Sequence, residues 1–207
     1  MPRLSHNDIK KELIIENPEL IGDKLNPGKG LLLCGAHFGN WEMMPHFFGR
    51  IISRRLNIIV KEQRNTSADK RINKIRASNG NHLISMKNSM RELLRLLHDG
   101  EIIAMLSDQY SPNGIKINFF NLKVIFPEGI ARIAVRKQSP VIYGSSFRNR
   151  GGKYLLKFTG ILPKGDSEDE KIKSIIQQYA TLLEEDIRKS PGHWLWFHRR
   201  FKSLISY

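Results

Sequence analysis

Apolar residues along this chain follow two spacings, one typical of short buried strands and the other of amphipathic helices. The first spacing predicts strands over residues 30–34, 56–60, 82–85, 102–107, 140–147 and 154–161, with 114–120 extended. The second predicts helices over 5–17, 43–53, 67–80, 89–100, 127–137 and 168–189. Strands alternate with helices as far as residue 147. This order predicts an α/β fold with a largely parallel, mixed central sheet flanked by helices on both faces.

Polar and turn residues mark the ends of several of these elements. Ser167 and Glu170 have the spacing of a capping box at the start of the last helix. The Asn-Arg-Gly-Gly run between the last two strands predicts a hairpin turn. The helix over 67–80 is expected to turn Ile72 and Ile75 inward.

Length and composition indicate one domain of 207 residues, with an N-terminal helix and turn over 1–27 and a core over 28–202. No apolar stretch reaches the roughly 18 residues that span a bilayer, and the start lacks a signal-peptide pattern. The single cysteine, Cys34, follows an apolar run, so it is expected to be buried and inert and can form no internal disulfide.

The net charge of +14 changes this picture, because such an excess attracts anions. The positive charge is concentrated between residues 50 and 76, a stretch that contains nine basic residues and two acidic ones. The partner could be nucleic acid, phosphorylated lipid or an acidic protein, unless the charge only solvates the surface.

The candidate chemistry lies in the run Gly35-Ala-His-Phe-Gly-Asn-Trp-Glu42, which joins the first strand to the next helix. Imidazole can accept a proton near neutral pH, and a carboxylate can orient it, so His37 and Glu42 could form a general-base pair. On one continuous helix their side chains would lie about 140° apart; a turn, which Gly39 and Asn40 allow, is needed to bring them together. Alternatively, His37 is a hydrogen-bonded structural residue.

A second candidate, Asp108, follows the predicted strand 102–107. Sites in parallel sheets form at the carboxyl ends of strands, and His37 also lies at such an end. The alternative is that Asp108 is a helix cap or a turn residue.

Five groups of residues occur in an order that is typical of one enzyme family. They are His37-Phe-Gly-Asn-Trp-Glu42, Arg76 with Gly80, Leu106-Ser-Asp-Gln109, Phe119-Phe120 with Gly129, and Trp194-Leu-Trp-Phe-His-Arg-Arg-Phe-Lys202. Together they resemble the lipid A biosynthesis (lauroyl or myristoyl) acyltransferases of the lysophospholipid acyltransferase superfamily, from about residue 28 to residue 202. The resemblance implies a glycerolipid-acyltransferase-like fold.

The resemblance also implies a reaction, in which an acyl chain moves from the thioester of acyl carrier protein to a hydroxyl of a lipid A precursor. His37 matches the catalytic histidine, Glu42 its carboxylate partner, and Asp108 and Arg76 two further site residues. No metal or organic cofactor is expected, and the histidines lack the spacing of zinc ligands.

Several neighbouring residues could assist this reaction. The backbone N–H groups of Gly39 and Asn40 are candidates, by location only, for stabilising the thioester oxyanion. Arg76, Lys61 and Arg64 could bind phosphates of the acceptor, and the same positive surface would favour the acidic carrier protein. Without the resemblance, Arg76 would be a solvated cation at a helix end.

Two further segments allow different interpretations. The tail 193–202 has four aromatic and three basic residues and no acidic one, a composition suited to a membrane–water interface or to aromatic packing against the sheet. The run Phe126-Pro-Glu-Gly129 resembles a motif of the wider superfamily, but it follows Asp108, so Glu128 is expected in the first turn of a helix and outside the site.

We therefore expect an acyltransferase attached peripherally to the anionic cytoplasmic face of a bacterial inner membrane, without the N-terminal membrane anchor of its relatives. Alternatives are an enzyme that acylates another lipid (a lysophospholipid or a glycolipid), a catalytically dead fragment, and a basic nucleic-acid-binding module. Nucleic acid is not the expected partner, because the basic residues accompany no known nucleic-acid motif.

Overall fold

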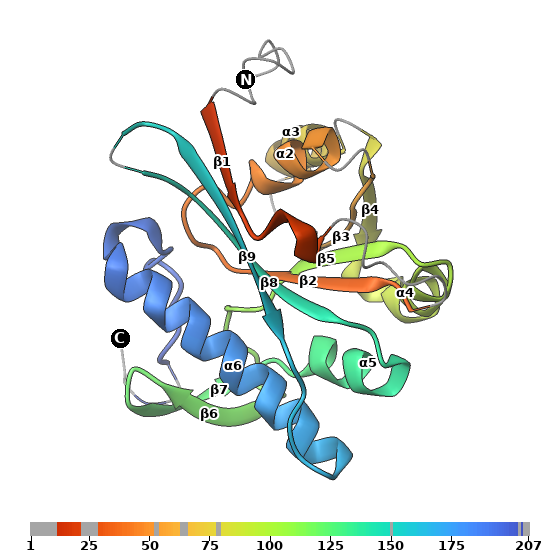
Figure 1. The fold of residues 1–207 in the computed structure, drawn as a ribbon, viewed down its shortest axis with the longest axis vertical. Helices are drawn as coiled ribbons and strands as arrows, with labels where there is room; N and C mark the ends of the chain where they lie inside the picture. Colours follow the sequence, from red (N-terminus) through yellow and green to blue (C-terminus); the bar gives the residue numbers. More distant parts are fainter. Residues whose placement is uncertain are drawn as a thin grey trace.

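A seven-stranded sheet forms the centre of the fold, as the computed structural model shows (Figure 1). The structure describes residues 12–21, 29–51, 54–62, 66–77, 80–149, 151–202 and 204. Neighbouring strands are parallel except for β8 and β9, so the predicted α/β class with a mixed, largely parallel sheet is confirmed. In spatial order the strands are β1 (Leu13–Glu16), β9 (Tyr154–Ile161), β8 (Val141–Arg148), β2 (Leu31–Gly35), β5 (Ile102–Leu106), β3 (Asn57–Val60) and β4 (His82–Ser85).

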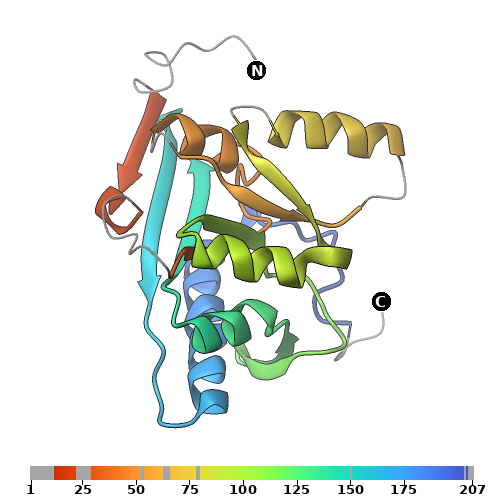
Figure 2. The ribbon, with the colours of Figure 1, turned by 90° about the vertical axis from the view of Figure 1, so that its right-hand side faces the viewer.

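Helices cover both faces of the sheet, which gives three layers (Figure 2). One face packs against α4 (Ser89–His98), α5 (Gly129–Lys137) and α6 (Glu168–Lys189), and the other against α2 (Met44–Ile51). Strand β2 is buried along its whole length, and its side chains alternate between the two cores, Leu32 toward α6 and Leu33 toward α2. Such two-sided burial explains why the strand is an unbroken apolar run.

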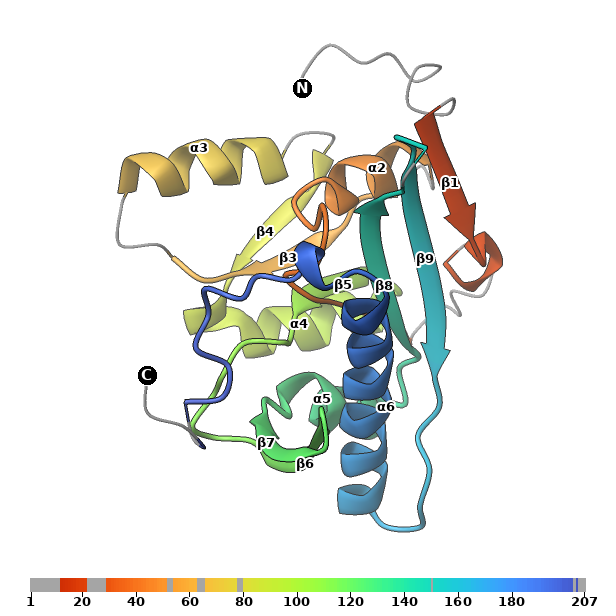
Figure 3. The same ribbon diagram turned by 90° about the vertical axis from the view of Figure 1, so that its left-hand side faces the viewer.

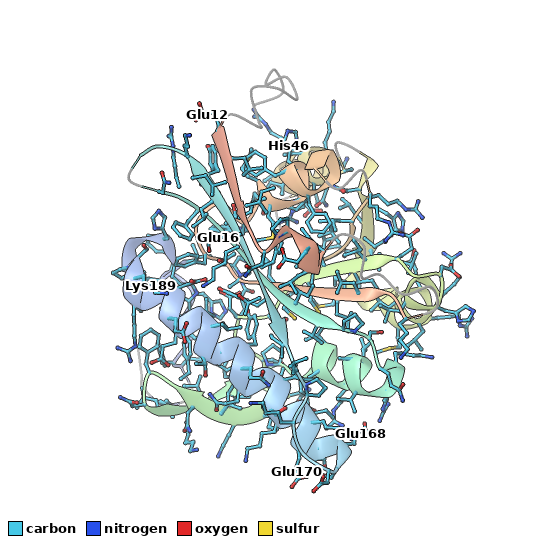
Figure 4. All side chains as sticks on the ribbon, viewed as in Figure 1. Glu12, Glu16, His46, Glu168, Glu170 and Lys189 are labelled. Carbon is cyan, nitrogen blue, oxygen red and sulfur yellow. The ribbon has the colours of Figure 1, made fainter. Side chains whose placement is uncertain are left out.

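The predicted bounds of α6 and β9 are confirmed, and the hairpin forms as predicted, with β8 displaced by one residue from the expected 140–147. Ser167 caps α6, and both hydrogen bonds of the capping box with Glu170 are present. Glu168 and Glu170 lie at the amino end of α6 and Lys189 at its carboxyl end, an arrangement that complements the helix dipole (Figure 4).

The expected N-terminal helix is wrong for residues 13–17; among its described residues, Glu12 alone is helical. Residues 13–16 form β1, which pairs in parallel with β9, Leu13 beside Tyr154. Pairing with β9 provides hydrogen-bond partners for the backbone of β1. Leu13 and Ile15 are half-buried whereas Ile14 and Glu16 are exposed, an alternation that fits a strand. Residues 5–11 of the expected helix lie outside the described residues.

Two other parts of the fold differ from the expectation. Helix α3 (Thr66–Arg76) buries none of its described residues, and Ile75, expected to face inward, is 51% exposed. The strand β7 (Leu122–Phe126) was not expected; it pairs with β6 (Ile115–Phe119), which confirms only the extended segment. The two strands join through Phe120 and Asn121, both at positive φ, without the glycine that usually marks such a turn.

The expectations for Cys34 and for membrane-spanning segments can be checked in the structure. Cys34 is buried in β2, and this burial raises the pKa of its thiol to about 12, so it is not a ready nucleophile. In the parts of the chain that the structure describes, no helix is both long enough and apolar enough to cross a membrane.

Candidate active site

The carboxyl ends of β2 and β5 bring His37 and Asp108 together. The two strands are parallel neighbours, with Gly35 beside Leu106, so the residues that follow them meet at one edge of the sheet. His37 Nδ1 lies 2.7 Å from Asp108 Oδ1, and the backbone N–H of His37 donates to Asp108 Oδ2 at 3.0 Å. Both residues follow the carboxyl ends of strands, as predicted, and Asp108 is neither a helix cap nor an isolated turn residue.

Asp108 is a buried carboxylate with several donors. A third hydrogen bond comes from Trp194 Nε1, at 3.0 Å from Oδ2. Burial opposes ionisation, but the hydrogen bonds and charge of His37, together with the Trp194 bond, outweigh it and hold the pKa of Asp108 below its usual range. The side chain therefore serves as a fixed, ionised acceptor for the imidazole.

These contacts define the tautomer of His37. Because an ionised carboxylate can only accept, Nδ1 carries the hydrogen that it donates to Asp108, and Nε2 has a free lone pair. The amide nitrogen of Gln109 lies 3.3 Å from Nε2 and can only donate to it. The His37 side chain is 19% exposed, so a substrate hydroxyl can replace this amide at Nε2. The arrangement is that of a general base with its orienting acid.

Glu42 does not orient the imidazole, contrary to the expected pairing. Its carboxylate binds Arg76 at two points, with Nε of Arg76 at 2.9 Å from Oε2 and Nη2 at 2.5 Å from Oε1. The turn does bring residues 37 and 42 to the same cavity, but the arginine offers Glu42 a bidentate partner. The guanidinium of Arg76 is thus fixed by Glu42 and is not a solvated cation; its side chain is only 17% exposed.

The expected oxyanion donors are also engaged elsewhere. The N–H of Gly39 donates to the carbonyl of His193 at 2.7 Å, and that of Asn40 to the carbonyl of Ser146 at 2.6 Å. Each backbone N–H carries a single hydrogen, so neither group is available to a thioester oxyanion. The two residues have a structural role instead: they attach the His37 turn to the tail and to β8.

Gly39 is expected to tolerate no side chain. Its φ is +60°, and a Cβ added there would lie 2.1 Å from the carbonyl oxygen of Ser146. We predict that Gly39→Ala lowers the free energy of unfolding by about 2–4 kcal/mol, measured by chemical denaturation. Gly129→Ala is the matched control, because a Cβ there meets open space and the φ is not positive; an equal loss in both variants would contradict the argument.

An apolar cavity of about 170 Å³ opens beside His37, between the sheet and α2. Leu33, Ile58, Val60, Ala104 and Met44 supply apolar walls. At its polar part lie His37, Glu42, Arg76, Gln109 and Lys61, so the structure brings Lys61 and Arg76 to one site. Arg64, the third expected phosphate ligand, lies outside the described residues.

The tail after α6 completes the site. Phe38 and Trp194 form an isolated antiparallel bridge, and the N–H of Leu195 donates to the carbonyl of His37 at 3.0 Å. Trp194 is 6% exposed, so packing against the sheet is confirmed for this ring. Arg200 is buried as well: its guanidinium lies 3.9 Å from the centre of the Phe126 ring, and burial lowers its pKa to about 10.

Glu128 lies outside the site, as expected, although it precedes the first turn of α5 instead of forming part of it. It is the N-cap residue of α5 rather than part of its first turn, and it forms an ion pair with Arg132 at 2.9 Å.

No pattern in the sequence placed Gln109 or Trp194 beside His37 and Asp108. Both lie within motifs that carry the family resemblance, directly after Asp108 and at the start of the tail motif. That position was the signal available; the contacts with His37 and Asp108 depend on the fold.

Two comparisons with known proteins place the chain among acyltransferases. The chain is 20% identical over 199 residues to a phosphatidylinositol mannoside acyltransferase of Mycolicibacterium smegmatis (strain ATCC 700084 / mc(2)155), a match that covers 94% of this chain. It spans 64% of that relative's length. The sequence model of the bacterial lipid A biosynthesis acyltransferases matches residues 1–203. With nearly its whole length matched, the chain belongs to the bacterial lipid A biosynthesis acyltransferase family.

Proposed function

We propose that this protein transfers a fatty acyl chain from the thioester of acyl carrier protein to a hydroxyl group of a lipid A precursor. The observation that carries the proposal is the His37–Asp108 pair, with Nε2 of the imidazole facing an apolar cavity. Family membership supports a lipid acyltransferase. The cytoplasmic face of the inner membrane is the proposed place of the reaction.

His37 acts as the general base in this proposal. As the acceptor oxygen attacks the thioester carbonyl, Nε2 takes the hydroxyl proton and the imidazole becomes a cation, which ionised Asp108 stabilises. When the carbon–sulfur bond breaks, the thiolate leaves and the imidazolium returns the proton to it. The products are an ester and a free carrier thiol, and His37 regains its initial state.

The cavity divides the substrates by polarity. Its apolar walls suit the part of the acyl chain nearest the thioester, whereas Lys61 and Arg76 suit a phosphorylated acceptor. Glu42 accepts from two of the five N–H donors of Arg76 and Asn73 from a third, so donors remain for a phosphate oxygen. Glu42 therefore positions the arginine in this mechanism.

An acyl-transfer assay tests the proposal. Acyl carrier protein that bears a labelled acyl chain is incubated with the enzyme and with either a lipid A precursor or a phosphatidylinositol mannoside. We expect the label to move to the lipid A precursor and to depend on His37. Transfer to neither acceptor under conditions in which the protein is folded would reject the function.

A second acceptor deserves the parallel assay because the relative from Mycolicibacterium smegmatis is a phosphatidylinositol mannoside acyltransferase. Both acceptors are phosphorylated glycolipids, so the base and the two cations serve either one. Transfer only to the mannoside, or only to a lysophospholipid, would keep the acyltransferase chemistry and replace the acceptor.

A further inference from the structure

The C-terminal tail is fixed to the same backbone segment as the catalytic histidine. The carbonyl of His193 accepts from Gly39 and that of His37 from Leu195, so the tail lies against the backbone that carries His37. Farther along, Nζ of Lys202 lies 4.2 Å from the centre of the Tyr110 ring, on the loop that carries Asp108. Figure 3 shows the tail, in dark blue, leaving α6 and running past the sheet toward β6 and β7. Whatever the tail binds is therefore brought next to the site.

Two aromatic side chains of the tail project into solvent. Phe197 is 95% exposed, the largest fraction among the exposed large hydrophobic residues, and Trp196 is 53% exposed. Trp196 Nε1 donates to the carbonyl of Pro191 at 2.7 Å, which fixes the indole while its polar group is already satisfied. Trp194, two residues before Trp196, is buried, so only part of the aromatic tail faces solvent.

The charged residues of the tail itself have one sign. No acidic residue occurs from residue 187 to the end of the chain, whereas Arg199 and Lys202 are exposed in the tail. Leu204 adds a third exposed apolar side chain, at 45%. Projecting aromatic rings flanked by cations match the chemistry of an anionic bilayer, whose headgroups attract the cations and whose interface accepts the rings.

We propose that Trp196, Phe197 and Leu204, with Arg199 and Lys202, form a docking surface for an anionic lipid bilayer on the tail that is attached to the His37 segment. The inference rests on the proposed function in one respect: a lipid acceptor must reach His37 from the membrane. The surface seats the site at the interface, so that an acceptor enters without leaving the bilayer. A bilayer is favoured over the acidic carrier protein because a ring with 95% exposure fits a soft interface and requires no preformed pocket.

Co-sedimentation with vesicles tests this surface without reference to catalysis. The full chain is mixed with phosphatidylglycerol vesicles and, separately, with phosphatidylcholine vesicles. We expect the protein to bind the phosphatidylglycerol vesicles and this binding to weaken as salt is added. For Phe197→Asp we expect partitioning to fall by about tenfold or more, because a ring that inserts into the bilayer is replaced by a negative charge that the anionic headgroups repel.

Leu162→Asp is the matched control. Leu162 is 70% exposed, and it follows β9, whose antiparallel direction places its end at the edge of the sheet opposite His37. The control makes the same change of charge and is expected to bind vesicles like the unmodified protein. Equal loss in both variants, or no loss in Phe197→Asp, would overturn the docking surface.

Activity separates this inference from the proposed function. With a detergent-dispersed acceptor, Phe197→Asp is expected to keep the normal transfer rate, whereas with a vesicle-embedded acceptor it is expected to be slow. If the unmodified protein binds vesicles through Phe197 but transfers no acyl chain, the function is wrong and the surface stands. If Phe197→Asp instead weakens binding of acyl carrier protein and leaves vesicle binding intact, the surface belongs to the carrier and the inference is wrong.

Discussion

Replacement of His37 by alanine is expected to lower the acyl-transfer rate by about 10²–10⁴-fold, the usual contribution of a positioned general base. Without the imidazole, no group takes the proton from the attacking hydroxyl. Turnover is measured with saturating acyl donor, and thermal unfolding is measured alongside to show that the variant is folded.

His82→Ala is the matched control for this variant. His82 also pairs with a carboxylate, Glu92, at 2.8 Å, but the pair lies on the surface at the start of β4. Its loss is expected to change turnover less than twofold, as surface pairs contribute little. Near-normal turnover in His37→Ala would remove the proposed mechanism.

Asp108→Asn is expected to reduce turnover by about 10²-fold or more while most of the site geometry remains. An amide is neutral, so it stabilises the imidazolium less, and its NH₂ must face one of the donors that Asp108 now accepts from. The mismatch is expected to cost about 1–3 kcal/mol of stability. Turnover and chemical denaturation are measured on the same preparation.

The same variant has an expected effect on acid stability. Because the folded pKa of Asp108 lies below its unfolded value of about 3.9, the carboxylate stabilises the fold above that pH and loses this contribution as the pH falls toward the folded pKa. The asparagine variant lacks this dependence, so its stability should fall less steeply below about pH 4.

Glu42→Gln distinguishes the two acids. Since Glu42 holds Arg76, its replacement is expected to raise KM for a phosphorylated acceptor more than it lowers kcat. A kcat loss as large as that of Asp108→Asn, combined with an active Asp108→Asn, would return Glu42 to the role that its spacing from His37 first suggested.

The position of His37 and Asp108 at one edge of the sheet could be predicted, because parallel strands present their carboxyl ends at the same edge. The partner of the imidazole could not. That choice depends on β2 and β5 being direct neighbours in the sheet, an order that no local pattern encodes. Arg76 lies in a helix 34 positions after Glu42 and binds its carboxylate. The five-residue spacing between His37 and Glu42 does not reveal this contact.

The expected oxyanion donors failed for a related reason. The groups that accept from Gly39 and Asn40 belong to the tail and to β8, more than 100 residues later in the chain. At the other end of the fold, the Leu13–Glu16 segment has apolar positions compatible with either element, and the exposed edge of β9 determines that it is a strand.

The bridge between Phe38 and Trp194 has a consequence for the synthesis of the protein. The donor to Asp108 and the acceptor for Gly39 come from residues that follow α6 and therefore leave the ribosome after the rest of the sheet. A nascent or proteolysed chain that ends before Pro191 lacks both contacts, and its base has an incompletely held acid. The proposed catalytic pair is thus fully held only once the segment that follows α6 has been synthesised.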